Sequence, residues 1–142
     1  MATLKFEEQK DVFIGVKLPI QNGQQGYFDS SLTTIDQVKT NIRNLLLTIK
    51  GERLMHPEFG TDINAILFEQ DDGTLVDRLE ESIVSAIEKW LPYISISKIQ
   101  INNETDAINL HKQVYSIKLE FVLKQDPTIF ESVTLTVAAL WR

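Results

Sequence analysis

Apolar residues recur at two different spacings along the chain, and the spacings separate helical from extended segments. One series follows the three-to-four-residue period of a helix, and its members are Ile35, Val38, Ile42, Leu45, Leu46 and Ile49. This series predicts an amphipathic helix from about Ile35 to Lys50, because such positions share one helix face. A second series predicts another long helix between Thr74 and Pro92; its members are Val76, Leu79, Ile83, Ala86, Ile87 and Trp90.

Residues that favour helix ends accompany these series. Thr34 and Gln37 have the spacing of a capping box, in which each side chain binds a free amide at the helix start. Between the two long helices, Asp62 or Thr61 can cap a short helix over Ile63–Glu69. The chain therefore has two main helices and a short one.

The last third of the chain alternates apolar and polar residues, which is the two-residue period of a strand. The alternation predicts strands over Ile94–Ile101, Tyr115–Leu123 and Val133–Val137, separated by Asn102–Leu110 and by a turn at Asp126-Pro127. A slip in the first of them at Lys98 predicts a β-bulge. Three successive strands indicate an antiparallel meander with one face against the helices.

The N-terminal part alternates over Val12–Leu18 and stops at Pro19, which predicts one more strand. The backbone of this strand needs a partner, either in the chain's own sheet or in a neighbouring subunit. We therefore expect a single α+β domain over residues 1–142, with 1–31 as an N-terminal extension. Its helices would pack on an antiparallel sheet made of the meander and the N-terminal strand.

The amino-acid composition limits the classes of function that the chain can have. The 142 residues carry a formal net charge of −6, which disfavours binding to nucleic acid. The absence of cysteine excludes disulfides and thiolate metal sites, and His56 and His111 are the only histidines, so we expect no metal or other cofactor.

No run approaches the ~18 apolar residues of a membrane span, and no secretory signal is present. We expect a soluble protein made in the cytoplasm, with no membrane partner.

The segment Lys50–Asp62 between the helices is unusual for a connection. Leu54, Met55 and Phe59 make it too apolar for a mere linker. Gly51 can take the left-handed conformation that closes a helix. We expect an ordered loop that packs on the domain through its apolar residues.

Three polar residues of this loop would then face outward. The guanidinium of Arg53 can bridge two carboxylates in a forked geometry, within the domain or across an interface. Glu58 either pairs with Arg53 or faces a partner. His56 is more simply a hydrogen-bonded loop histidine than a ligand, a base or a pH switch.

Carboxylates are the only plausible catalytic groups. Glu58, Asp62 and Glu69 lie close in sequence, and a glycosidase needs one carboxyl kept protonated beside an ionised one. Each has a simpler structural role, such as the helix cap that Asp62 can form. We therefore expect no enzyme, and a peptidoglycan-cleaving glycosidase is the competing hypothesis.

The loop also carries a signature. A Gly-Glu-Arg triplet at 51–53, a Pro-Glu-Phe-Gly-Thr-Asp run at 57–62 and a Leu-Phe-Glu triplet at 67–69 follow one another. This series resembles the baseplate wedge family of contractile phage tails, which also serves type VI secretion systems and other injection machines. Parts of that family have been labelled lysozyme-like. The likeness covers about Leu32 to Val137.

The resemblance implies a structural role in the virion, in a tail baseplate assembled in the host cytoplasm. Such a protein docks on a helical bundle of larger wedge subunits, and its strand edges template the first ring of the tail sheath protein by β-augmentation. Tail tube or hub proteins are further candidate partners. The alternative context is the equivalent part of a type VI secretion or extracellular injection system.

The resemblance also indicates binding residues. A Glu-Pro-Arg triplet that helps docking in the family is Leu91-Pro92-Tyr93 here, so only the proline is kept and Tyr93 can supply an aromatic contact. Candidate strand edges are Val12–Leu18 and Val133–Ala139, and the terminal apolar pair includes Trp141. The predicted partner-binding residues are Arg53, Glu58, Phe59, Pro92, Tyr93 and Trp141.

Overall fold

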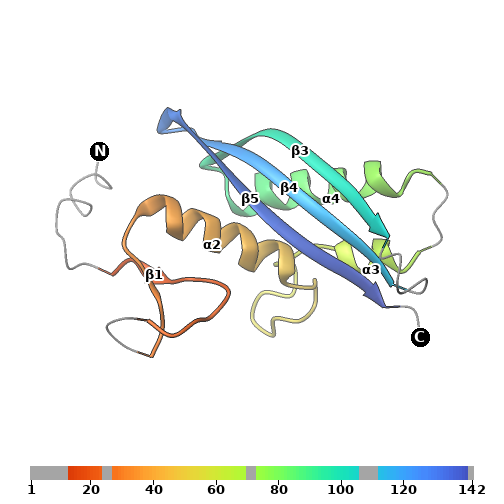
Figure 1. Cartoon of the computed structure of the whole chain (residues 1–142), viewed down its shortest axis with the longest axis horizontal. Helices are drawn as coiled ribbons and strands as arrows, with labels where there is room; N and C mark the ends of the chain where they lie inside the picture. Colours follow the sequence, from red (N-terminus) through yellow and green to blue (C-terminus); the bar gives the residue numbers. More distant parts are fainter. Residues whose placement is uncertain (1–12, 24–26, 70–72, 106–111, 141–142) are drawn as a thin grey trace. The chain divides into compact units, whose positions relative to one another are not determined.

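The computed structural model describes residues 13–23, 27–69, 73–105 and 112–140. Figure 1 shows its elements, which are β1 (Gly15–Val16), β2 (Ser30–Ser31), α2 (Thr34–Leu47), α3 (Ile63–Leu67), α4 (Leu75–Trp90), β3 (Ile94–Thr105), β4 (Lys112–Leu123) and β5 (Asp126–Leu140). The predicted α+β class is confirmed. Contacts group the chain into two units, Met1–Asn44 and Leu45–Arg142.

The first unit contains a short antiparallel pair. Gly15 lies opposite Ser31, and Val16 lies opposite Ser30. The predicted strand Val12–Leu18 is thus shorter than expected, and Val12 itself lies outside the described residues. Its partner is β2, which the sequence did not predict, and these strands form a sheet separate from that of β3–β5.

The first long helix begins and ends earlier than predicted. Thr34 is its first helical residue, and the hydroxyl of Thr33 accepts the amide of Asp36 at 3.2 Å, so the predicted capping box of Thr34 with Gln37 is wrong. The Gln37 side chain instead donates to the Asn41 side chain at 2.9 Å. In the same unit the Arg43 guanidinium donates to the carbonyl of Leu18 at 2.7 Å, which ties the helix to the segment after β1.

The helix ends at Leu47 rather than Lys50, because the chain leaves the helix there and forms an isolated β-bridge between Ile49 and Thr61. Ile49 is consequently exposed, although it continues the apolar series. Gly51 does have a positive φ of 90°. It lies in the turn after the bridge, however, and does not cap the helix as predicted.

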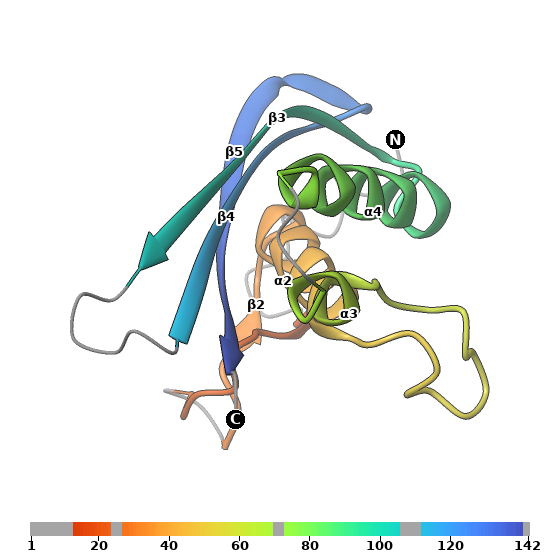
Figure 2. The same cartoon turned by 90° about the vertical axis from the view of Figure 1, so that its right-hand side faces the viewer.

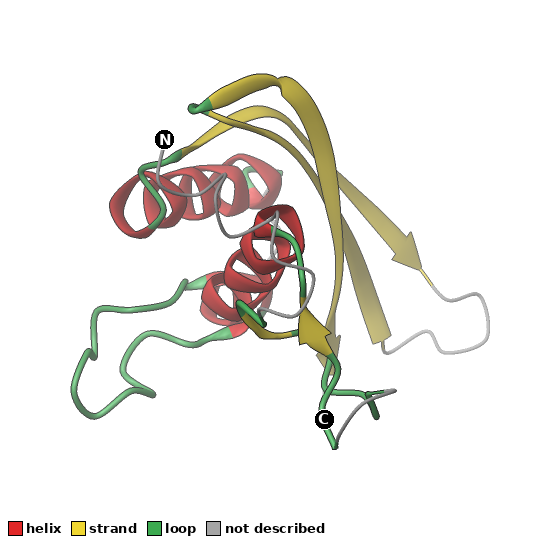
Figure 3. Cartoon of the chain, turned by 90° about the vertical axis from the view of Figure 1, so that its left-hand side faces the viewer, coloured by secondary structure: helices red, strands yellow, loops and turns green. Residues whose placement is uncertain are grey.

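The second unit has α3 and α4 on one side of a three-stranded sheet of order β3-β4-β5, as Figures 2 and 3 show. Both strand pairs are antiparallel, so the predicted meander is confirmed. The register shifts between Ile96 and Lys98, where a bulge was predicted. The buried apolar residues of α4 are Leu75, Leu79, Ile83, Ala86 and Ile87, while Val76 of the predicted stripe is exposed.

The strands extend further than their alternation indicated. Asn102–Thr105, predicted as loop, continues β3 in register with β4. The turn between β4 and β5 is Lys124-Gln125, so Asp126 already belongs to β5. Ladder hydrogen bonds sustain a strand where polar residues interrupt the apolar pattern, which explains both differences.

Candidate protein-binding surface

The Lys50–Asp62 loop is closed at its base by hydrogen bonds to the end of α2. The amide of Thr61 donates to the carbonyl of Thr48 at 2.9 Å, and its buried hydroxyl donates to the carbonyl of Leu46 at 3.0 Å. Farther from the base of the loop, the amide of Gly51 donates a hydrogen bond to the carbonyl of Pro57 at 2.7 Å. The loop is therefore an ordered structure, as predicted, and it is held by hydrogen bonds of its backbone and of the Thr61 hydroxyl.

Gly60 is required for this closure. Its φ is 120°, and a Cβ at this position would lie 2.4 Å from the carbonyl oxygen of Thr48. Gly51 has a φ of 90° but open space around it. The two glycines of the signature thus serve different needs: Gly60 permits both a close approach and a rare conformation, and Gly51 only the conformation.

An aromatic stack fastens the loop to the C-terminal end of α4. The Arg53 guanidinium lies 3.9 Å from the centre of the Phe59 ring, and that ring meets Trp90 edge-on with centroids 5.2 Å apart. His56 also approaches Trp90, at 6.5 Å between ring centroids. The predicted interface residues Arg53 and Phe59 therefore contact each other, and both side chains are half-buried.

Sequence reasoning placed Trp90 on the apolar stripe of its helix and missed this contact. Its only sequence signal was that it is the last and largest member of that stripe. Because α4 ends at Trp90, the indole ring is available to the loop.

Three carboxylates of this region are paired with cations. The Glu58 carboxylate accepts a 2.7 Å hydrogen bond from the Lys89 ammonium, which lowers the pKa of Glu58 below its ordinary value, first through this bond and then through the charge of Lys89. Asp62 pairs with Lys50, and Glu69 pairs with Arg78 on α4. Glu58 thus has Lys89 as its cation, where a pair with Arg53 was one expectation.

Neither α3 nor α4 begins with a side-chain cap, although Asp62 was a predicted cap of α3. Asp62 occupies the N-cap position of α3 without a side-chain capping hydrogen bond, because its carboxylate is engaged with Lys50. Thr74 occupies the corresponding position of α4, again without a side-chain cap.

The apolar residues of the loop do not all pack inward as predicted. Leu54 is 99% exposed and Met55 is 88% exposed. Phe59 alone of the three is half-buried, and Phe68 farther along is exposed. His56 and Glu58 are exposed, as expected.

Pro92 and Tyr93 lie in the turn that joins α4 to β3. Pro92 is exposed and Tyr93 is half-buried. The carbonyl of Tyr93 accepts the amide of Lys124 at 3.0 Å, which fixes this turn beside the turn between β4 and β5. Trp141, the last predicted binding residue, lies outside the described residues.

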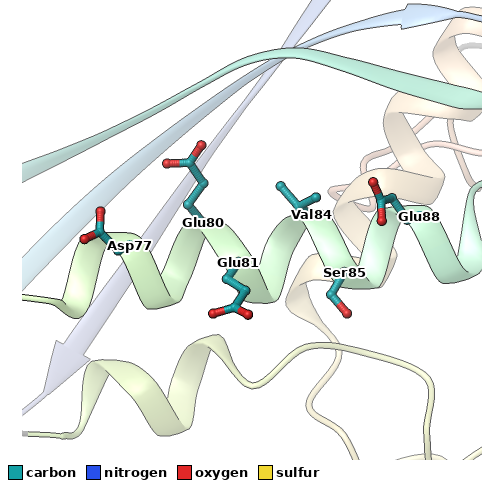
Figure 4. Close-up of a pocket in the computed structure, with 6 residues that line it drawn as sticks. All are labelled: Asp77, Glu80, Glu81, Val84, Ser85 and Glu88. Carbon is teal, nitrogen blue, oxygen red and sulfur yellow. The ribbon is translucent and has the colours of Figure 1, made fainter.

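A groove of about 580 Å³ runs between α4 and β3. Its helix wall includes Glu80, Val84 and Glu88, and its strand wall includes Ile94–Ile99. In Figure 4 these three helix residues project to the side on which β3 passes, whereas Glu81 and Ser85 project toward α3. Sequence reasoning missed this groove, because its walls are distant in the chain.

Within residues 13–23, 27–69, 73–105 and 112–140, no cluster of three His, Asp or Glu side chains could hold a metal ion. No helix in that part of the chain has the length and apolar character to span a membrane.

Several solved structures share this arrangement. Superposition on the type VI secretion baseplate complex gives a TM-score of 0.56 at 18% identity, over 75% of this chain and 94% of the other. The anti-feeding prophage baseplate gives 0.54 at 16% identity, over 85% and 81%. A protein of Geobacter sulfurreducens described as a putative tail lysozyme gives 0.57 at 21% identity, over 78% and 93%. The chain therefore shares its fold with these proteins.

The family follows from the sequence comparison. Residues 33–128 match the family described as baseplate wedge protein gp25, and the chain belongs to that family. Baseplate wedge protein gp25 of Enterobacteria phage T4 is 26% identical over 102 residues, which cover 72% of this chain and 74% of the relative. The resemblance inferred from the loop is confirmed, and the chain is a structural baseplate component of contractile tail systems.

Proposed function

We propose that this baseplate component docks on the larger wedge subunits through the Lys50–Asp62 loop and the turn at Pro92-Tyr93. The observation that carries the proposal is the stack of Arg53, Phe59 and Trp90. It joins the loop to the end of α4, immediately before Pro92, so residues far apart in sequence form one surface. A preorganised surface loses little conformational entropy when a partner binds.

We further propose that the sheet offers a strand edge on which the first ring of the sheath protein assembles. The edges of the three-stranded sheet are β3 and β5, while β4 is paired on both sides. Edge strands present unpaired amides and carbonyls that can recruit a strand from another chain. The β5 edge was expected from the sequence, and β3 is a further candidate.

An assembly assay tests the docking surface. Arg53→Ala is expected to leave a soluble fold and to give baseplates that lack extended sheath in negative-stain micrographs. Lys118→Ala, which removes a half-buried cation on β4 outside this surface, is the matched control. Normal tails with Arg53→Ala would show that the proposed interface is wrong.

The proposed location is a phage virion, with assembly in the host cytoplasm, and tail tube or hub proteins are further candidate neighbours. The equivalent part of a type VI secretion or extracellular injection system is the alternative, supported by the two baseplate folds. Neighbouring genes separate these contexts. Capsid and portal genes would favour the phage, whereas their absence beside secretion genes would favour the alternative.

A peptidoglycan-cleaving glycosidase is the second candidate, because one similar structure is described as a putative tail lysozyme. A general acid needs a raised pKa, and the Lys89 ammonium lowers that of Glu58. Asp62 and Glu69 likewise lie against cations. These pairs favour a protein without catalytic activity. Clearing of a cell-wall suspension that disappears in Glu58→Gln and Asp62→Asn would overturn this view.

A further inference from the structure

We propose that the groove between α4 and β3 binds an extended segment of a partner chain. The segment carries two basic residues four positions apart and an apolar residue midway between them. This inference deepens the proposed template role, since it assigns the incoming strand to one edge and describes the side chains of that strand.

The first observation is the free side of β3. In the part of the chain that the structure describes, β3 pairs with β4 only. The bulge near Ser97 lies within the stretch that lines the groove. A bulge discourages indiscriminate pairing at an edge, so recognition here must also use side chains.

The second observation is that the inner face of the sheet is incompletely covered along β3. Ile99 and Ile101 lie opposite Leu119 and Ile117 in the ladder. The two β4 residues are 0% exposed, while the two β3 residues are only half-buried. One more strand beside β3 would cover these isoleucines and remove apolar surface from water.

The third observation is the spacing of the helix wall. Glu80, Val84 and Glu88 follow one another at four-residue intervals, which is about 6 Å along a helix. Alternate residues of a strand are about 6.7 Å apart. A segment lying along α4 can therefore place three successive same-face side chains against these three residues, which Figure 4 shows on one side of the helix.

Charge decides which side chains fit. Glu80 and Glu88 are exposed, and neither has an ion pair with another residue of the described ranges. Two Lys or Arg side chains would pair with them, while Val84 would meet the apolar residue. The strand wall carries Lys98 and Lys124 instead, so residues on the other face of the segment are polar or acidic.

The test uses two synthetic peptides and the full-length protein. One peptide has the core Lys-Thr-Val-Thr-Lys, and the other has Glu-Thr-Val-Thr-Glu. In ¹H–¹⁵N spectra the first is expected to shift amides of Ser95–Ile99 and of α4. The double variant E80K/E88K should weaken this binding roughly tenfold and strengthen the second peptide by a similar factor, because two ion pairs change sign.

Glu81→Lys is the matched control, because it makes the same change on the same helix but faces α3. It should leave both affinities unchanged, and circular dichroism should show equal folding of all variants. Absence of binding, equal affinity for both peptides, or shifts confined to β5 would overturn the proposal.

Assembly assays separate this inference from the proposed function. Peptide binding as expected together with normal sheaths in E80K/E88K would leave the groove assignment standing and refute the template role. Suppose instead that the wild-type protein does not bind the first peptide and that E80K/E88K still loses extended sheath. That result would refute the groove assignment alone.

Discussion

The Lys50–Asp62 loop and the groove between α4 and β3 contrast in how they use their polar groups. In the loop, Glu58 and Asp62 each lie against a lysine, and Arg53 covers the Phe59 ring. In the groove, Glu80 and Glu88 are exposed without such partners in the described ranges. The loop can therefore bind a partner as a rigid body, without rearranging its own ion pairs. Glu80 and Glu88 of the groove, by contrast, can still form ion pairs with a partner.

This contrast shows that the segment that identifies the family need not be the segment that binds a partner. The signature residues of the loop identify the family partly because they build the loop: Gly60 allows the closure and Phe59 anchors it. The groove has no sequence signature, since exposed glutamates on a helix are ordinary. A conspicuous motif therefore marks structural necessity as readily as contact with a partner.

The largest effect is expected at Gly60. Gly60→Ala should lower the free energy of unfolding by more than about 2 kcal/mol, because the new Cβ meets the Thr48 carbonyl and the backbone conformation is unfavourable. Gly51→Ala should cost about 1 kcal/mol, from conformation alone. Urea denaturation measures both. Equal costs would mean that closure of the loop does not depend on the close approach.

A smaller effect is expected where the loop meets α4. Trp90→Leu keeps an apolar side chain but removes the edge-on ring contact with Phe59, so we expect a loss of about 1 kcal/mol. Val84→Ala in the groove is the comparison and should cost less, since Val84 is only half-buried. A larger cost at Val84 would show that the groove is already a packed region.

The smallest effect concerns protonation. Lys89→Met should raise the pKa of Glu58 toward its ordinary value, measured by a carboxyl-detected NMR titration. Because the folded-state pKa is lowered, the pair stabilises the loop above the unfolded pKa and loses that effect as pH falls through the folded pKa. Lys118→Met, which removes a lysine that pairs with Glu120 on β4, is the control variant and should leave the pKa of Glu58 unchanged. An unaltered Glu58 would mean that the pair does not persist in solution.

Much of the fold was predictable because it depends on short-range periodicity. The apolar series located the long helices and the alternation located the three strands, including the bulge near Lys98. The helix ends were harder. Lys50 and Gly51 lie beyond α2, because the bridge between Ile49 and Thr61 outweighs the local preference for another helical turn.

The candidate site was predictable only in part. Arg53, Glu58 and Phe59 were singled out from the signature, but their partners Trp90 and Lys89 lie far along the chain. The exposure of Leu54 and Met55 reverses the expected packing of the loop. Apolar character alone does not say which side of an irregular loop a residue faces, since no period constrains it.

By itself the sequence determined the α+β class, the order of the main elements and the family, since local periods and a contiguous motif carry these. Only the tertiary structure decided which charges pair, that the loop stacks on the end of α4, and that β3 borders an open groove. These features depend on segments distant in the chain that meet after the backbone has folded, and a pattern along one dimension does not encode such distances.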